Sequence, residues 1–237
     1  HTIPSDKGLF LGETWRLHPD ITAFTSEMFY DGKLRSKDGL DVQVIKSTGA
    51  VSGAGLGFVP VPHTGNQNCS PEEADVIREL VTSILHCKPT WLDREGNEET
   101  LTLEDIIIIT PYNAQVFEIQ QRLPGARVGT VDKFQGQEAP IAIYSMATSS
   151  HADAPRGMEF LYSLNRFNVM ASRARAKLIV LLTRSLVDHL ADDGDVLQES
   201  RLLKNYAESF CQSPTSIVLG FRENGRDTLR PGILRVH

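Results

Sequence analysis

The sequence of 237 residues is poor in cysteine, has no long apolar run and has no apolar signal region at its N-terminus. Its three cysteines, Cys69, Cys87 and Cys211, are scattered and odd in number, so they form neither a zinc-ligand pattern nor a disulfide framework. No apolar stretch approaches the roughly 20 residues that span a bilayer. These absences argue against a metal site and against membrane partners, and they predict a reducing, cytoplasmic location.

The sequence also lacks the motif with which a single domain holds a nucleoside triphosphate. That motif, Gly-x-x-x-x-Gly-Lys-Ser/Thr between a strand and a helix, surrounds the phosphates with backbone N–H groups. The glycine cluster from Gly53 to Gly57 has no lysine and no following helix, and Gly32-Lys33 is followed by leucine. No predicted strand ends in an Asp-Glu pair that could hold Mg²⁺. The chain alone is therefore not expected to hydrolyse a nucleotide.

What is present is an ordinary globular composition with an uneven distribution of charge. Apolar residues make up 41% of the chain and charged residues 23%, which is enough for one domain with a substantial core. The net charge of −6 argues mildly against a general polyanion binder. Between Arg122 and Lys177, however, 8 Lys and Arg outnumber 4 Asp and Glu. This stretch could form a local surface that faces phosphate groups, although chance clustering would give the same count.

Predicted strands and helices alternate along the chain, which favours an α/β fold with a parallel sheet. Strands are expected at 56–61, 106–109, 126–131, 141–146 and 178–182. Helices are expected at 19–29, from 71 onward, at 113–123, 161–175, near 186 and at 196–211. Ser70 is predicted to cap the second helix, with Glu73 completing a capping box. We expect residues 1–212 to form the main domain and 213–237, which are rich in Gly, Pro and Arg, to form a peripheral tail or an extra hairpin.

Four segments with functional side chains follow one another along this framework. They are Thr14–Pro19 with Phe29–Leu34, Ile109–Gln115, Arg127–Glu138 and Asn165–Arg175. In this order they resemble motifs of superfamily 1 helicases, and most of all superfamily 1B, which includes the nonsense-mediated-decay helicase. The long forms 132–147 and 157–175 are most similar to bacterial proteins that fuse a RecB-like nuclease to such a helicase.

The resemblance implies a RecA-like fold, with a parallel sheet covered by helices on both faces but without the P-loop itself. It identifies the chain as the second, C-terminal RecA-like motor domain of an ATP-dependent DNA or RNA helicase. The cofactors it implies are ATP and Mg²⁺, bound mainly by a first RecA-like domain. The partners it implies are single-stranded DNA or RNA, that first domain and a fused RecB-like nuclease domain. Because the chain starts at His1 and lacks the P-loop, we expect it to be part of a longer protein.

The resemblance also assigns residues to the ATP side of the domain. Arg16 and Arg173 match positions that contact the γ-phosphate from the facing domain, where an arginine can accelerate phosphoryl transfer by roughly 10³ to 10⁵. Glu138 matches a carboxylate that accepts hydrogen bonds from the ribose hydroxyls, and Trp15 replaces a tyrosine that packs on the adenine. The alternatives are salt-bridging arginines, a loop-end acid that faces water and a core aromatic. Arg175 is predicted to be structural.

Two further residues of the third motif are predicted to lie close to ATP. Gln135 is implied to couple the grip on nucleic acid to the ATP site, and Gly136 is expected to adopt a loop conformation closed to other residues. On the same loop, Thr130 and Lys133 are implied to contact the backbone of a single strand.

Tyr112 and Gln115 follow the predicted strand 106–109 and are the remaining candidates for nucleic-acid binding. The end of a parallel strand is where α/β sheets usually bind ligands. Tyr112 could stack on a base, which is worth about 1–3 kcal/mol, or it could be a packing tyrosine.

A second hypothesis is a non-catalytic RecA-like module that binds nucleic acid or a protein. It follows from the missing P-loop and the acidic balance. The presence of Arg16 and Arg173 together weighs against it, because such a module has no ATP to sense.

Overall fold

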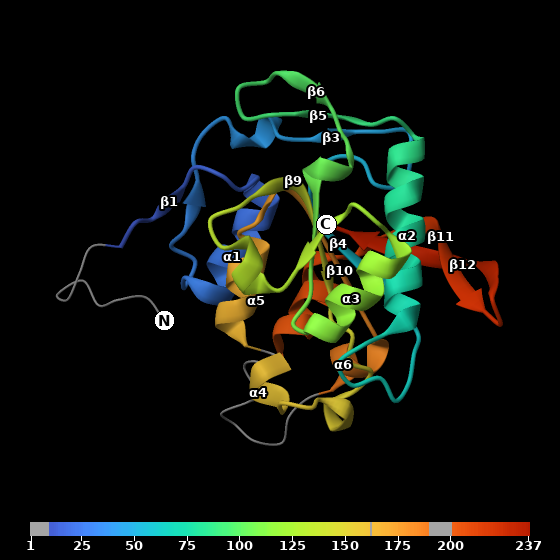
Figure 1. Ribbon diagram of the computed structural model, residues 1–237. Coiled ribbons are helices and arrows are strands. Elements are labelled where there is room, and N and C mark those ends of the chain that lie inside the picture. Colours follow the sequence, from blue (N-terminus) through green and yellow to red (C-terminus); the bar gives the residue numbers. More distant parts are fainter. Residues whose placement is uncertain (1–9, 162, 190–200) are drawn as a thin grey trace.

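The computed structural model describes residues 10–161, 163–189 and 201–237. Its centre is a seven-stranded sheet in the order β11-β12-β4-β10-β9-β7-β8 (Figure 1). The strands are β4 (Gly55–Pro60), β7 (Ile106–Ile109), β8 (Arg127–Gly129), β9 (Ala139–Ser145), β10 (Ala174–Leu182), β11 (Ser213–Glu223) and β12 (Arg226–Val236). Five neighbouring strands of this sheet, β4, β10, β9, β7 and β8, are parallel. The predicted α/β fold with a mainly parallel sheet is therefore confirmed.

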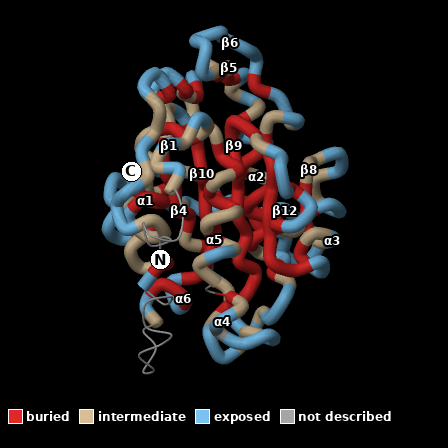
Figure 2. The backbone as a smooth tube through the Cα atoms, turned by 90° about the vertical axis from the view of Figure 1, so that its left-hand side faces the viewer, coloured by how far each residue is buried: buried red, intermediate tan, exposed pale blue. Residues whose placement is uncertain are grey.

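Helices cover both faces of this sheet, which explains why its central strands β7, β9 and β10 are buried along almost their whole lengths (Figure 2). Ile107 and Ile109 face a core shared with Phe24 and Phe167, from α1 and α5. Ile106 and Ile108 face the opposite core, with α2 and α3. The α-helices are α1 (Pro19–Phe29), α2 (Pro71–His86), α3 (Asn113–Arg122), α4 (Met158–Leu161), α5 (Leu164–Ala171) and α6 (Arg184–Asp188).

Short helical turns connect several of these elements. They are η1 (Leu40–Val42), η2 (Leu103–Asp105), η3 (Val131–Phe134) and η4 (His151–Asp153), and the π-helical η5 (Asn205–Phe210) continues a helical segment that is described from residue 201. The predicted strand 126–131 therefore ends at Gly129, and η3 begins two residues later, at Val131. The first five residues of the predicted helix 196–211 lie outside the described residues. None of the helices in the described ranges is both long and apolar enough to cross a membrane.

The predicted helix 161–175 is wrong at both ends: α4 ends at Leu161 and α5 begins at Leu164, and the last four predicted residues, 172–175, are not helical. Helix α5 ends at Ala171, and β10 already begins at Ala174, four residues before the predicted strand. From the carbonyl of residue 173, the backbone begins to form sheet hydrogen bonds instead of helical ones. The N–H of Ala139 donates to the carbonyl of Arg173 at 3.0 Å. Arg173 therefore lies in the turn and Arg175 on the strand, so neither lies on a helix.

The start of α2 confirms half of its predicted capping box. The Ser70 hydroxyl accepts a hydrogen bond from the Glu73 N–H at 3.1 Å, as an N-cap should. The return bond is absent, because the Ser70 N–H donates to the side chain of Gln115 instead. The Glu73 carboxylate is fully buried and accepts hydrogen bonds from other partners, including the Ser145 hydroxyl.

Residues 213–236 form a hairpin rather than a tail. Strands β11 and β12 pair along their whole lengths, and β12 joins β4 through Arg235 and Val236. Leu234 is buried in the core that contains α2.

Two small sheets complete the fold, and the sequence did not predict either of them. The first pairs β1 (Glu13–Thr14) with β2 (Arg35–Ser36). The second contains β3 (Ile45–Lys46), β5 (Thr90–Leu92) and β6 (Glu98–Thr100). It lies at the top of the molecule in Figure 1.

Candidate functional site

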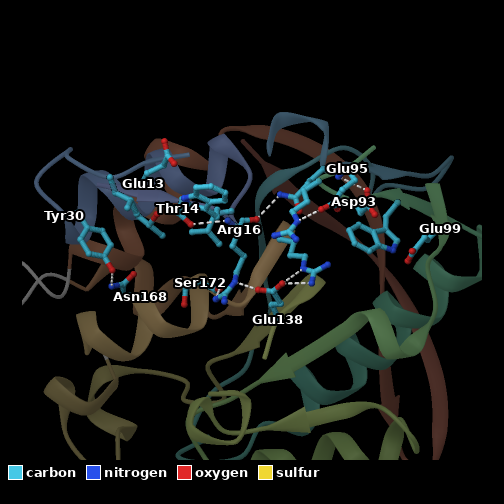
Figure 3. Close-up of a pocket in the computed structure, with 18 residues that line it drawn as sticks. Glu13, Thr14, Arg16, Tyr30, Asp93, Glu95, Glu99, Glu138, Asn168 and Ser172 are labelled. Atoms are coloured by element: carbon cyan, nitrogen blue, oxygen red, sulfur yellow. Dashed lines mark hydrogen bonds and ion pairs between the residues drawn. The ribbon is translucent and has the colours of Figure 1, made fainter. Parts of the chain in front are cut away.

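A cavity of about 700 Å³ opens where β9 and β10 begin, and it gathers residues that are far apart in the sequence (Figure 3). Trp15 and Arg16 reach it from the segment after β1, and Glu138 from the residue before β9. Ser172 and Arg175 reach it from the turn after α5 and from the start of β10. Strands β9 and β10 are parallel, so their starts lie at the same edge of the sheet.

Glu138 is the electrostatic centre of this cavity. Arg16 forms an ion pair with one of its carboxylate oxygens. The Arg175 Nε donates to the other oxygen at 2.7 Å. Arg16 also donates to the carbonyl oxygen of Ser172 at 3.2 Å. Glu138 is thus not a loop-end acid that faces water, and Arg175 has the structural pairing that was predicted for it.

Arg173 lies next to this group but is not part of the cavity wall. It is 9% exposed, and its guanidinium donates to the carbonyl oxygens of Val169 at 2.9 Å and Gln137 at 3.1 Å. Burial lowers the pKa of this guanidinium, and the nearby positive charge of Arg16 lowers it further. The positive charges of Arg173 and Arg16 are therefore close enough to repel each other, and Glu138 offsets part of that repulsion.

Trp15 is exposed at the rim of the cavity. It is 59% exposed, so the alternative of a core aromatic is excluded. The ammonium group of Lys37 lies 3.0 Å from the centre of the indole ring. Such a ring can accept a flat ligand on a free face.

The sequence missed the wall of the cavity that comes from the small sheet of β5 and β6. That wall contains Trp91, Asp93, Arg94, Glu95 and Glu99. Figure 3 shows Asp93, Glu95 and Glu99 across the cavity from Tyr30 and Asn168. The Asp93 carboxylate shapes the turn by accepting from two backbone N–H groups, those of residues 95 and 97. In the sequence, this wall could have been recognised only as a polar turn between two short strands. The turn reaches the cavity because β5 pairs with β3, and that pairing cannot be seen in the sequence.

Asn168 ties α5 to the opposite side of the same cavity. Its side-chain amide donates to the Tyr30 hydroxyl at 2.9 Å. The carbonyl of Arg16 is fixed in turn by the Gln43 amide, also at 2.9 Å. The Gln43 bond therefore holds the backbone of Arg16 independently of its ion pair.

A second groove, of about 450 Å³, lies at the opposite edge of the sheet, where β7 and β8 end. Tyr112 and Thr130, each predicted to contact nucleic acid, both line it, and so do Arg156 and Arg166. Tyr112 is only 6% exposed and packs on Phe160, with ring centres 5.7 Å apart. Burial raises the pKa of its hydroxyl. Most of the Tyr112 ring is therefore packed inside the protein, as the alternative prediction of a packing tyrosine has it. The remaining part of the ring lines the groove.

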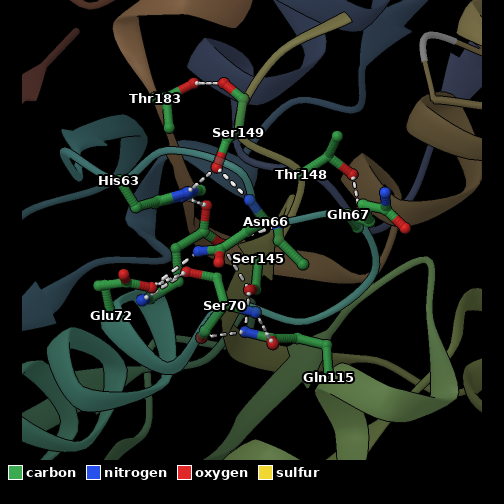
Figure 4. Close-up of polar contacts among 12 residues, drawn as sticks. His63, Asn66, Gln67, Ser70, Glu72, Gln115, Ser145, Thr148, Ser149 and Thr183 are labelled. Atoms are coloured by element: carbon green, nitrogen blue, oxygen red, sulfur yellow. Dashed lines mark hydrogen bonds and ion pairs between the residues drawn. The ribbon is translucent and has the colours of Figure 1, made fainter. Parts of the chain in front are cut away.

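Gln115 cannot contact nucleic acid in this structure, which corrects the prediction from sequence. It is 0% exposed. Its amide oxygen accepts from the Ser70 N–H at 2.7 Å, and its amide nitrogen donates to the Ser70 carbonyl and the Ser145 hydroxyl (Figure 4). The amide therefore ties α2 and α3 to β9 inside the protein.

Lys133 also points elsewhere than predicted. Its ammonium group donates to the Val128 carbonyl at 2.7 Å, and its side chain lies against Gly129, where a Cβ atom would collide with it. It does not line the groove. Gln135 and Gly136 lie on the loop between η3 and β9, which connects the two edges of the sheet. Gly136 has a φ of 77°, the conformation for which the sequence predicted glycine.

Metal ligands do not gather at either cavity. In the ranges that the structure describes, no group of three His, Cys, Asp or Glu residues could hold a metal ion.

The fold is that of a RecA-like α/β domain, with Arg16 and Arg175 at a cavity at one edge of the sheet and Arg156 and Arg166 at a groove at the other. Residues 3–185 match the family described as an AAA domain (AAA_12), and the chain belongs to that family.

Several of the curated relatives that the chain matches are named helicases. Helicase sen1 of Schizosaccharomyces pombe is 25% identical over 89% of this chain and 14% of its own length. DNA polymerase alpha-associated DNA helicase A of the same organism is 28% identical over 73% of this chain and 27% of its own length. DNA replication ATP-dependent helicase/nuclease JHS1 of Arabidopsis thaliana is 30% identical over 47% of this chain and 8% of its own length. The chain thus spans less than a third of each of these relatives.

Proposed function

We propose that this chain is the second motor domain of an ATP-dependent helicase that moves on single-stranded DNA or RNA. The observation that carries the proposal is the convergence of Trp15, Arg16, Glu138, Ser172 and Arg175 at one cavity, with Arg173 next to it. These residues come from three separate motifs, and a structural role alone would not require all of them to meet.

The residues at this cavity fit a nucleoside triphosphate that is held mainly by another domain. The exposed indole of Trp15 suits a purine base, and the paired charges of Arg16 and Arg173 suit a terminal phosphate. The sequence has no P-loop, and the described residues have no metal cluster, so most contacts to the phosphates and Mg²⁺ belong to a first RecA-like domain. When bound, ATP supplies the γ-phosphoryl group, which gains negative charge as it is transferred.

Arg16 is the residue that must move in this mechanism. It is held by Glu138, so it reaches a phosphate only when that ion pair opens. Glu138 then keeps Arg175 and is free to accept hydrogen bonds from ribose hydroxyls. Arg173 needs a smaller change, because its partners are neutral carbonyl groups. Closure of the two motor domains would drive both arginines onto the phosphate, and hydrolysis would release them.

The single strand would run along the groove of Tyr112 and Thr130, at the other edge of the sheet. The loop with Gln135 and Gly136 joins the groove to the nucleotide cavity, and we propose that it couples the two. The names of two relatives include DNA, and one of these, JHS1, is named a helicase/nuclease. They support DNA as the substrate and a nuclease in the longer protein, for which the sequence resemblance suggests a RecB-like domain. We also propose a cytoplasmic location, and a part in DNA repair that rests on the resemblance to nuclease–helicase fusion proteins.

Steady-state kinetics of the longer protein with its P-loop domain test the proposal. Arg16→Ala and Arg173→Ala should each lower nucleic-acid-stimulated kcat by about 10² to 10³ while leaving ATP binding nearly unchanged. Arg230→Ala is the control, because Arg230 is an exposed arginine on β12 that is paired with Glu223. Wild-type turnover in both variants would contradict the arginine-finger role and favour a non-catalytic binding module.

A further inference from the structure

Two arginines lie over one aromatic ring beside the second groove. The guanidinium carbon of Arg156 is 4.9 Å from the ring centre of Phe160, and that of Arg166 is 4.4 Å from it. Tyr112 packs on the same ring. Phe160 belongs to α4, and Arg166 to the start of α5, which lies just above α4 in Figure 1. We call Arg156, Phe160 and Arg166 the arginine–phenylalanine cluster.

Among the residues that the structure describes, no carboxylate forms an ion pair with the cluster, whereas Arg16 and Arg175 share Glu138. Asp132 is the one carboxylate among the residues that line the groove. This excess of positive charge stands out in a chain whose net charge is −6. An anion in the groove would meet two guanidinium groups that have no ion-pair partner in the described ranges, with Asp132 as the one carboxylate in the lining.

The aromatic ring positions the guanidinium groups without using their N–H donors. A cation–π contact holds the flat face of a guanidinium, and the edge donors stay available for oxygen atoms. Phosphate oxygens accept such paired donors well. Thr130 adds a hydroxyl to the same groove. The groove therefore offers donors for phosphate along a partly aromatic wall, which is the composition of single-strand binding surfaces.

The position of the cluster separates it from the nucleotide cavity. The groove follows the ends of β7 and β8, whereas the cavity precedes β9 and β10, and these four strands are parallel. The cluster therefore lies at the opposite sheet edge from Arg16 and Glu138. A mononucleotide in the cavity would not satisfy its charge.

We propose that Arg156 and Arg166, positioned by Phe160, bind the phosphodiester backbone of the single strand, in place of the Lys133 and Gln115 contacts that the sequence predicted. This rests on the proposed function and names the groups that grip the strand. Arg156 and Arg166 act as the phosphate ligands, and Phe160 is a positioning residue.

The test is binding of a fluorescein-labelled dT20 oligonucleotide to the purified chain, followed by anisotropy at several NaCl concentrations. For single strands, each lost phosphate contact should reduce the slope of log K against log salt by about 0.7. Arg156→Ala and Arg166→Ala should each weaken binding several-fold, and the double variant more than tenfold with a slope smaller by about 1.4. Phe160→Leu, which keeps apolar bulk but removes the ring face, should also weaken binding.

Arg230→Ala is a matched control, because Arg230 also lies over an aromatic ring, 5.2 Å from the centre of Phe221, but is paired with Glu223. It should bind dT20 like the wild type. A double variant with the affinity and slope of this control would overturn the inference and leave the proposed function standing. Binding of a fluorescent ATP analogue that is lost in Arg156→Ala would overturn it too, because the cluster would then be a nucleotide site. Absence of dT20 binding by the wild type would count against the inference and the proposed function together.

Discussion

Glu73 offers the sharpest test of how the sheet edge beside the groove is held in place. Its fully buried carboxylate accepts from the Ser145 hydroxyl at 2.6 Å and from the Ala147 N–H at 3.0 Å, and it contacts the His63 ring nitrogen at 3.0 Å. The other His63 nitrogen lies 2.7 Å from the Ser149 hydroxyl (Figure 4). One carboxylate thus joins α2 to the end of β9 and to the loop that follows it.

Glu73→Gln keeps the shape of the side chain but replaces one acceptor oxygen with a donor. Ser145 and Ala147 share one carboxylate oxygen, so the amide oxygen can serve both. The new NH₂ group then faces His63, which loses a charge-assisted hydrogen bond in a buried site. Such a bond is worth about 1.5–3 kcal/mol, and we expect the free energy of unfolding to fall by about that amount.

Urea unfolding of the purified chain, followed by circular dichroism, measures this loss. Glu72→Gln is the control on the same helical turn, because Glu72 is half-buried and accepts from Ser70 and Asn66. Its amide oxygen can keep both bonds, so we expect a change below about 0.5 kcal/mol. If the urea unfolding curves of the two variants had the same midpoint and the same slope, the buried contacts of the Glu73 carboxylate would contribute no more to stability than the half-buried contacts of Glu72. That result would refute the reasoning.

Two further predictions concern buried polar groups in the core. Burial lowers the pKa of Lys177 from 10.5 to about 8, although its ammonium group donates to the Ser52 carbonyl. Between pH 8 and 10.5 the unfolded chain binds this proton and the folded chain does not, so the residue's contribution to the free energy of unfolding rises by up to about 3 kcal/mol. Lys177→Met should remove that rise, and identical pH dependence of urea unfolding in the two proteins would disprove it. Tyr206→Phe should cost about 1 kcal/mol in the same assay, because the buried hydroxyl lies 3.0 Å from the carbonyl oxygens of both Gly57 and Leu178; an unchanged midpoint would mean that these contacts contribute nothing.

Much of the framework could be predicted because its signals are local. The run Ile106–Ile109 is apolar on both sides, and it became a strand that is buried on both faces. Pro19–Phe29 was predicted as a helix with these same bounds. Ser70 capped α2 because the capping bond spans only three residues.

Errors occurred where distant contacts compete with local preference. The stretch after Ala171 has helix-forming residues, but pairing of Ala174 with Ala139 on β9 pulls it into the sheet. Gln115 has the sequence position of a ligand-binding residue, yet its amide meets Ser70, 45 residues away. No pattern within a few residues carries that information.

The sequence by itself determined the class of the domain. The α/β order, the four motifs and the lack of a P-loop can each be recognised from residues that are close together in the chain. Only the tertiary structure decided how the charged groups are distributed. It paired Arg16 with Glu138, buried Arg173 against carbonyl groups, and left Arg156 and Arg166 over Phe160 without a carboxylate partner in the described ranges. The reason is that a charge acts through the groups around it in space, and the fold sets those groups by bringing together strands and loops that the sequence keeps far apart.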